Sequence, residues 1–189
     1  MTTSLLLIAL VTICRVVPHE WNLVAVGAVA LYAGAKLPRR WAWAVPIAGM
    51  VLSDLILDWG HAEPERAPFT ASRLTIYGTY IAIAFLGILA RRARGWTAPF
   101  SLGALALAGS SLFFLTTNFA EWIAGPLNLY PHTWAGLVAC YTAAIPFFDK
   151  TLVADLVGTG LLFGLDALVH RLAERRGIAK PTKVELVEA

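Results

Sequence analysis

The chain has 189 residues, of which 58% are hydrophobic and 14% are charged, and its mean hydropathy is +0.68. Soluble domains are about 45–50% apolar and about 25% charged, so the composition excludes an ordinary water-soluble protein and predicts an integral membrane protein. The formal charge of +3 comes with no nucleic-acid-binding motif, so we expect the lipid bilayer, and no nucleic acid, among the partners.

Six membrane-spanning helices are predicted along the chain, and one further apolar segment lies between the last two. The predicted spans are residues 3–18, 22–37, 41–58, 74–91, 98–120 and 151–170. The further segment, residues 133–148, is interrupted at Pro146 and is predicted to form a short helix that packs on the outer side or enters the membrane only partway. The predicted fold is an all-α six-transmembrane-helix bundle in one domain, residues 1–172, followed by a cytoplasmic, disordered tail, residues 173–189.

The positions of the Lys and Arg residues predict the orientation of these spans. With the N-terminus inside the cell, 11 of the 15 basic residues fall in the loops around 36–40 and 91–94 and in the tail beyond residue 170. This is the distribution that the positive-inside rule requires. A further crossing at 133–148 would break it. We therefore expect a multi-pass protein of the inner cell membrane with both termini in the cytoplasm.

Most of the ionisable residues within the spans are predicted to lie in the outer half of the membrane. Arg15, Asp54 and Asp155 are expected to form a buried charge network there, because a charge at membrane depth needs a partner. One alternative is that Arg15 and Asp54 pair for purely structural reasons. The outer side as a whole carries eight acidic and four basic residues, which favours a cationic or neutral polar ligand over a dianion.

The stretch from residue 113 to 155 is predicted to form much of a ligand pocket. Asn118, Glu121 and Trp122 lie at the outer end of the fifth span, where they offer a hydrogen-bond donor, acceptors and an aromatic face. The alternative is an interhelical hydrogen bond, with Trp122 at the membrane interface. Neighbouring loops complete the predicted substrate-binding set with His19, Asn22, Tyr130 and His132.

No catalytic, cofactor-binding or metal-binding motif is present in the sequence. The histidines at 19, 61 and 132 lack HxxxH or HExxH spacing, and the two cysteines lack CxxC spacing. We therefore expect no cofactor, no metal ion and no enzymatic activity. The alternative, a membrane enzyme, would need an acid–base pair in one cavity, for which Glu121 and Asp155 are the best candidates.

Several stretches resemble known families. The run IPFFDKTLVADLVGTGLLF, residues 145–163, and the run LFFLTTNF, residues 112–119, resemble parts of S-components, the substrate-binding membrane subunits of energy-coupling factor (ECF) vitamin transporters. In riboflavin-type members an Asn at the position of Asn118 faces the ligand. The stretch RVVPHEWNLVAVGAVALYAGAKLPRRWAWAVPIAGMVLSDL, together with TNFAEW and YPHTWAGLVACY, resembles a family of small uncharacterised bacterial membrane proteins described as transport proteins.

The resemblance to S-components implies a membrane subunit for the uptake of a vitamin-like or cofactor-precursor molecule, bound near the outer face. It also implies partners that supply energy, namely an ECF-type coupling protein and ATPase subunits, or else facilitation without them. Two features depart from that pattern: SRLTIYGTY, residues 72–80, lacks the cobalt-ligating cysteine of the cobalamin-transporting S-component, and the first span lacks an AxxxA motif. The alternative function is a non-transporting membrane scaffold or assembly factor.

Overall fold

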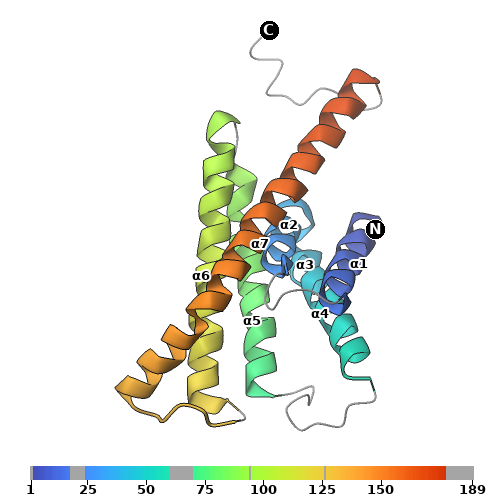
Figure 1. The fold of residues 1–189 in the computed structure, drawn as a ribbon. Helices are drawn as coiled ribbons and strands as arrows, with labels where there is room; N and C mark the ends of the chain where they lie inside the picture. Colours follow the sequence, from blue (N-terminus) through green and yellow to red (C-terminus); the bar gives the residue numbers. More distant parts are fainter. Residues whose placement is uncertain (1, 18–23, 60–69, 94, 126, 178–189) are drawn as a thin grey trace.

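The computed structural model describes residues 2–17, 24–59, 70–93, 95–125 and 127–177, and its regular elements there are all helices (Figure 1). These elements are α1 (Thr2–Val16), α2 (Val26–Lys36), α3 (Arg39–Ala42), α4 (Ala44–Leu57), α5 (Ala71–Leu86), the 3-10 turns η2 (Leu89–Arg92) and η3 (Gly95–Thr97), α6 (Ala98–Ala124) and α7 (Trp134–Arg175). The predicted all-α class is therefore correct for the described part of the chain.

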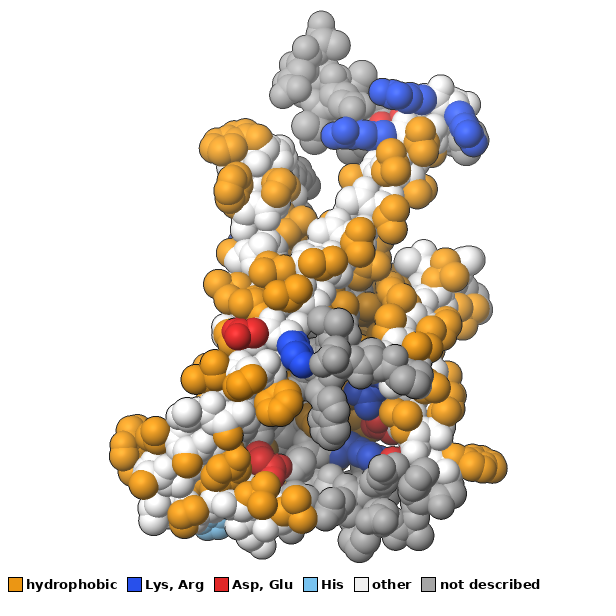
Figure 2. Space-filling view, in the orientation of Figure 1, with side chains coloured by type: hydrophobic (Ala, Val, Ile, Leu, Met, Phe, Trp, Pro, Cys, Tyr) orange, Lys and Arg blue, Asp and Glu red, His pale blue; other side chains and the backbone are white. Residues whose placement is uncertain are grey.

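Four helical segments are long and apolar enough to cross a membrane: Arg39–Leu57, Ala71–Arg92, Gly95–Ala124 and Trp134–Arg175. Large hydrophobic side chains cover their outer surfaces, as Figure 2 shows, which is the pattern of helices that face lipid. The first two predicted spans correspond to α1 and α2, which have 15 and 11 residues. At 1.5 Å per residue α2 is about 16 Å long, roughly half of the hydrocarbon core of a bilayer.

Residues 133–148 do not form a separate short helix. They are the first part of α7, a continuous helix of 42 residues that includes Pro146. The helix begins where the Thr133 hydroxyl accepts a hydrogen bond from the Gly136 N–H at 3.2 Å. A proline inside a helix costs about 3 kcal/mol, and we attribute its tolerance here to the packing of α7 along α6.

Helix α2 lies at the centre of the bundle, where every residue from Val26 to Gly34 is buried. It contacts α4, α5, α6 and α7. Its close approach to α5 depends on glycine: a Cβ atom on Gly34 would lie 1.9 Å from the carbonyl oxygen of Ala84. Only the absence of a side chain lets the two backbones come this near.

Helices α4 to α7 alternate in direction, so the bundle has two distinct ends (Figure 1). The end of α4, the start of α5 and the turn that contains residues 127–133 lie at one of them, the turn end (Figure 1). Helix α7 finishes at the other, the basic end, where Lys and Arg side chains gather (Figure 2). The basic residues in the last two turns of α7 and just after it are Arg171, Arg175 and Arg176.

Candidate functional site

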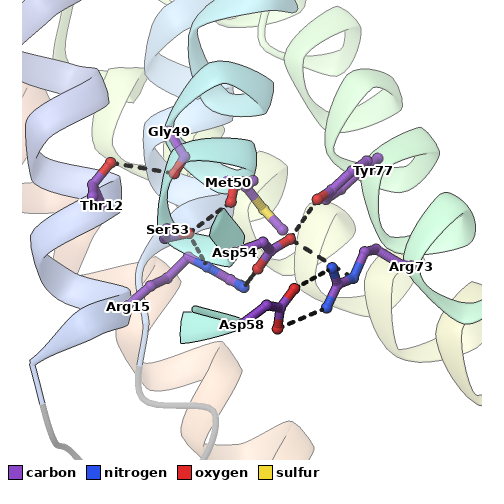
Figure 3. A network of polar contacts seen from close by, with 9 residues as sticks. All are labelled: Thr12, Arg15, Gly49, Met50, Ser53, Asp54, Asp58, Arg73 and Tyr77. Carbon is purple, nitrogen blue, oxygen red and sulfur yellow. Dashed lines mark hydrogen bonds and ion pairs between the residues drawn. The ribbon is translucent and has the colours of Figure 1, made fainter. Parts of the chain in front are cut away.

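A cluster of polar side chains joins α1, α4 and α5 (Figure 3). Arg15 of α1 donates through Nε to the Ser53 hydroxyl at 2.7 Å and through Nη2 to Asp54 Oδ1. The other oxygen of Asp54 accepts the hydroxyl of Tyr77, which comes from α5. The structure therefore brings Arg15 and Asp54 together and adds the hydroxyls of Ser53 and Tyr77 to the pair.

Arg73 of α5 adds a second ion pair to this cluster. Its Nη1 lies 2.6 Å from Asp58 Oδ2 and its Nη2 lies 3.4 Å from Asp58 Oδ1, while its Nε lies 3.9 Å from Asp54 Oδ2. Asp54 is thus placed between two guanidinium groups, and the two arginines balance the two aspartates. Buried charges arranged in this way fix helices to one another.

Spacing in the sequence contains a signal for this second pair. Asp54 and Asp58 are four residues apart on α4, and Arg73 and Tyr77 are four apart on α5, so each pair occupies one helix face. Two such faces on consecutive helices, one with two carboxylates and the other with a guanidinium group and a hydroxyl, predict a contact between α4 and α5.

Asp155 does not belong to this cluster, so the predicted network of three charges is incorrect. Its buried carboxylate accepts the backbone N–H of Ala28 at 3.0 Å and the hydroxyl of Ser110 at 2.8 Å. Ala28 lies in the first turn of α2, where backbone N–H groups have no partner within the helix. Gly27 leaves the space for this contact, since a Cβ there would lie 2.3 Å from Asp155 Oδ2.

A pocket of about 260 Å³ lies between α5, α6 and α7, toward the turn end of the bundle. Asn118 and Glu121, both predicted to bind substrate, are among its lining residues. Its aromatic wall consists of two adjacent pairs of rings, one from α6 and one from α7: Phe113, Phe114, Phe147 and Phe148. The rings of Phe114 and Phe148 pack with their centroids 4.9 Å apart, which closes the wall between the two helices.

Several polar side chains of the pocket are bonded to their own helices. The Thr117 hydroxyl donates to the carbonyl of Phe113 at 2.7 Å, and Asn118 Nδ2 donates to the carbonyl of Phe114 at 2.7 Å. Glu121 differs from them. Its side chain is half-buried, and within the described part of the chain no hydrogen bond or ion pair reaches its carboxylate.

A second pocket of about 230 Å³ lies against the polar cluster and includes Arg15, Asp54 and Arg73 in its lining. Ser72 and Ile76 line both pockets, so the two cavities share a wall formed by the start of α5. The Ser72 hydroxyl is buried and has no hydrogen-bond partner in the described structure. The ion pairs and the aromatic pocket are therefore direct neighbours.

Trp122, Tyr130 and His132 do not line the aromatic pocket. The indole N–H of Trp122 donates to the carbonyl of Pro131 at 3.0 Å, and its ring lies 5.7 Å from the His132 ring. These contacts hold the turn between α6 and α7, so Trp122 has a structural position here. The remaining predicted site residues, His19 and Asn22, lie outside the described residues.

The phenylalanine rings were not among the predicted site residues. A signal for them exists, because each Phe pair is followed three residues later by a pocket threonine, Thr117 on α6 and Thr151 on α7. Residues three apart share a helix face, so both helices present an aromatic and polar face.

Glu121 lies on that face but Asp155 does not line the pocket, so these two carboxylates are not arranged as an acid–base pair.

The chain belongs to DUF6580, a family of unknown function, and the match covers residues 1–177. This agrees with the predicted membership of an uncharacterised family. No curated protein and no solved structure matches the chain, so nothing in these comparisons links it to the S-components.

Proposed function

We propose that the protein is a substrate-binding membrane protein with a role like that of an S-component. In this proposal it binds a vitamin-like or cofactor-precursor molecule in the pocket between α5, α6 and α7 and takes part in its uptake. The observation that supports this best is the pocket itself, which joins four aromatic rings to Asn118 and to Glu121, whose carboxylate has no partner among the described residues. Polar groups are costly at membrane depth and typically line a path or site for a solute.

The size of the pocket restricts the ligand. Sites for drug-sized ligands measure about 300–1,000 Å³, and this pocket measures about 260 Å³. It therefore suits a molecule of one ring with a short polar arm better than a large cofactor. Precursors of cofactors fall in this size class.

The positive-inside rule, applied to the basic end, places that end in the cytoplasm and the turn end outside. Under this orientation, six crossings leave both termini in the cytoplasm, with α1 and α2 as the two short ones. Ser72 at the start of α5 and Glu121 at the end of α6 both line the pocket, so it would receive its ligand from the outer side. Energy for uptake would come from ATPase subunits through an ECF-type coupling protein. Alternatively, the protein would act alone by facilitated transport.

A second candidate function is that of a non-transporting scaffold or assembly factor. The observation that favours it is the basic end, where α7 carries Arg171 and Arg175 on an exposed helix terminus. Such a surface suits anionic lipid headgroups or an acidic partner. In that case function would depend on these arginines and not on the pocket.

Mass spectrometry of small molecules that co-purify with the detergent-solubilised protein tests the proposal. We expect one organic compound to be enriched with the wild type and lost from Asn118→Ala and Glu121→Gln. Thr142→Ala is a matched control, because Thr142 is exposed on α7 and does not line the pocket. If the pocket variants retain the compound, or if only charge reversal at Arg171 and Arg175 abolishes function in cells, the substrate-binding role is wrong.

A further inference from the structure

We infer that the ligand of the aromatic pocket is a small organic cation that carries N–H donors. This inference rests on the proposed function, because it names the class of molecule that the same pocket would bind. Three properties of the lining support it: the direction of its hydrogen-bond donors, the sign of its charge, and the aromatic rings that face the same space.

Most hydrogen-bond donors of the lining are already engaged. The hydroxyls of Thr117 and Thr151 each have a single hydrogen, and each donates it to a carbonyl of its own helix, at 2.7 and 3.1 Å. Asn118 also turns its Nδ2 toward its own helix. The two hydroxyls therefore offer only lone pairs, while Asn118 keeps its carbonyl oxygen and one N–H, so acceptor sites outnumber the free donors of these side chains and favour a ligand that donates hydrogen bonds.

The charge of the lining is negative. Among the described residues of the lining, Glu121 is the single carboxylate, and none is Lys, Arg or His. Glu121 lies in the last turn of α6, where the helix macrodipole is also negative. The carboxylate and the negative end of the helix dipole repel each other, and a bound cation would attract both.

The charges of the neighbouring cluster do not offset this negative site. Arg73 follows Ser72 in the shared wall, but its guanidinium group is held by Asp58 at 2.6 Å and lies 3.9 Å from Asp54. Arg15 is likewise bound to Asp54. Since the cluster contains equal numbers of arginine and aspartate, its net contribution to the potential in the aromatic pocket is small.

The aromatic wall fits a cation as well. The rings of Phe113, Phe114, Phe147 and Phe148 line the same space as Glu121. The negative face of an aromatic ring attracts a cation, and the attraction is stronger where water is excluded. The Ser72 hydroxyl is the one lining hydroxyl whose hydrogen has no partner in the described structure, so it can donate to an acceptor atom on the ligand.

Three compounds of nearly equal shape test the ligand class: phenylethylamine as the cation, phenylethanol as the neutral molecule and phenylpropionate as the anion. Each is titrated against the full-length protein in detergent, with thermal stability and intrinsic tryptophan fluorescence as readouts. We expect the amine to bind at least about tenfold more tightly than the other two, since a hydrogen bond to a charged group contributes about 1.5–3 kcal/mol. A cation that binds no better than its neutral and anionic analogues would overturn the inference.

Variants then assign the preference to a residue. Glu121→Gln should lower the affinity for the amine about tenfold and leave phenylethanol unaffected, because only the charge is removed. Asp149→Asn, at an exposed carboxylate of α7 that is not among the lining residues, should change neither. If Glu121→Gln retains the cation preference, the assignment is wrong. A co-purified uncharged compound that depends on Asn118 would also overturn the ligand class, while it would leave the proposed substrate-binding function in place.

Discussion

The carboxylate of Asp155 accepts a hydrogen bond from the backbone N–H of Ala28 at 3.0 Å, so a side chain of α7 caps the first turn of α2. The opposite end of α2 has a complementary partner. Arg91 donates to the carbonyl of Gly34 at 2.8 and 3.0 Å and to that of Leu37 at 2.6 Å. An anion at the N-terminus and a cation at the C-terminus both stabilise a helix dipole. This short central helix is thereby held at both ends by side chains of other segments.

Replacing Asp155 with alanine should destabilise the bundle by about 1–3 kcal/mol, because a buried N–H loses its acceptor. Asp155→Asn retains an acceptor oxygen and should cost less. Thermal unfolding in detergent, followed by tryptophan fluorescence, measures both. Asp149→Asn on the same helix is the control, since Asp149 is exposed. A melting temperature for Asp155→Ala equal to that of the control would show that the cap is energetically unimportant.

Gly34→Ala should also destabilise the protein, because the new Cβ would lie 1.9 Å from the carbonyl oxygen of Ala84. That oxygen belongs to a backbone and cannot move aside, so α2 and α5 must separate, and overpacking of this kind costs about 1–3 kcal/mol or more. Gly160→Ala is the matched control on α7, where no atom of the described residues lies within 4 Å of the added methyl group. It should be neutral or stabilising by up to about 1 kcal/mol. Equal melting temperatures for the two variants would contradict the close α2–α5 contact.

The ion pair between Arg73 and Asp58 should show coupling in a double-mutant cycle. Either Arg73→Met or Asp58→Asn removes one partner of this ion pair, which costs up to about 3 kcal/mol at a buried site. The two side chains are 16% and 24% exposed, so solvent screening should place the values toward the lower end of that range. The double variant should lose less than the sum of the single variants, by about 1 kcal/mol. Strict additivity of the three unfolding measurements would show that the pair contributes no net coupling.

Local patterns in the sequence predict the membrane class and the helical segments, because hydropathy is a property of neighbouring residues. The positions of Asn118 and Glu121 on one helix face are equally local, and the structure places both in the pocket. The continuity of α7 through Pro146 is not local, since it depends on packing against α6. The partner of Asp155 could not be predicted either. It is a backbone amide 127 positions away, and a backbone donor has no signature in the sequence.

The turn between α6 and α7 should be accessible from outside the cell. Leu129 in this turn is 62% exposed, and Arg176 lies just beyond the end of α7 at the basic end. In a background where Cys14 and Cys140 are replaced by alanine, Leu129→Cys should react with a membrane-impermeant maleimide on intact cells. Arg176→Cys should react only after the membrane is permeabilised, because the positive-inside rule retains the basic end in the cytoplasm.

The opposite labelling pattern would place the turn end on the cytoplasmic side, together with the end of the pocket that Ser72 and Glu121 line. Uptake through this pocket would then begin from the wrong compartment, whatever its ligand. Labelling of both positions in intact cells would mean that residues 134–175 do not cross the membrane. That result would contradict their assignment as one long spanning helix. The 42 helical residues extend about 63 Å, which is long enough to reach well beyond the hydrocarbon core.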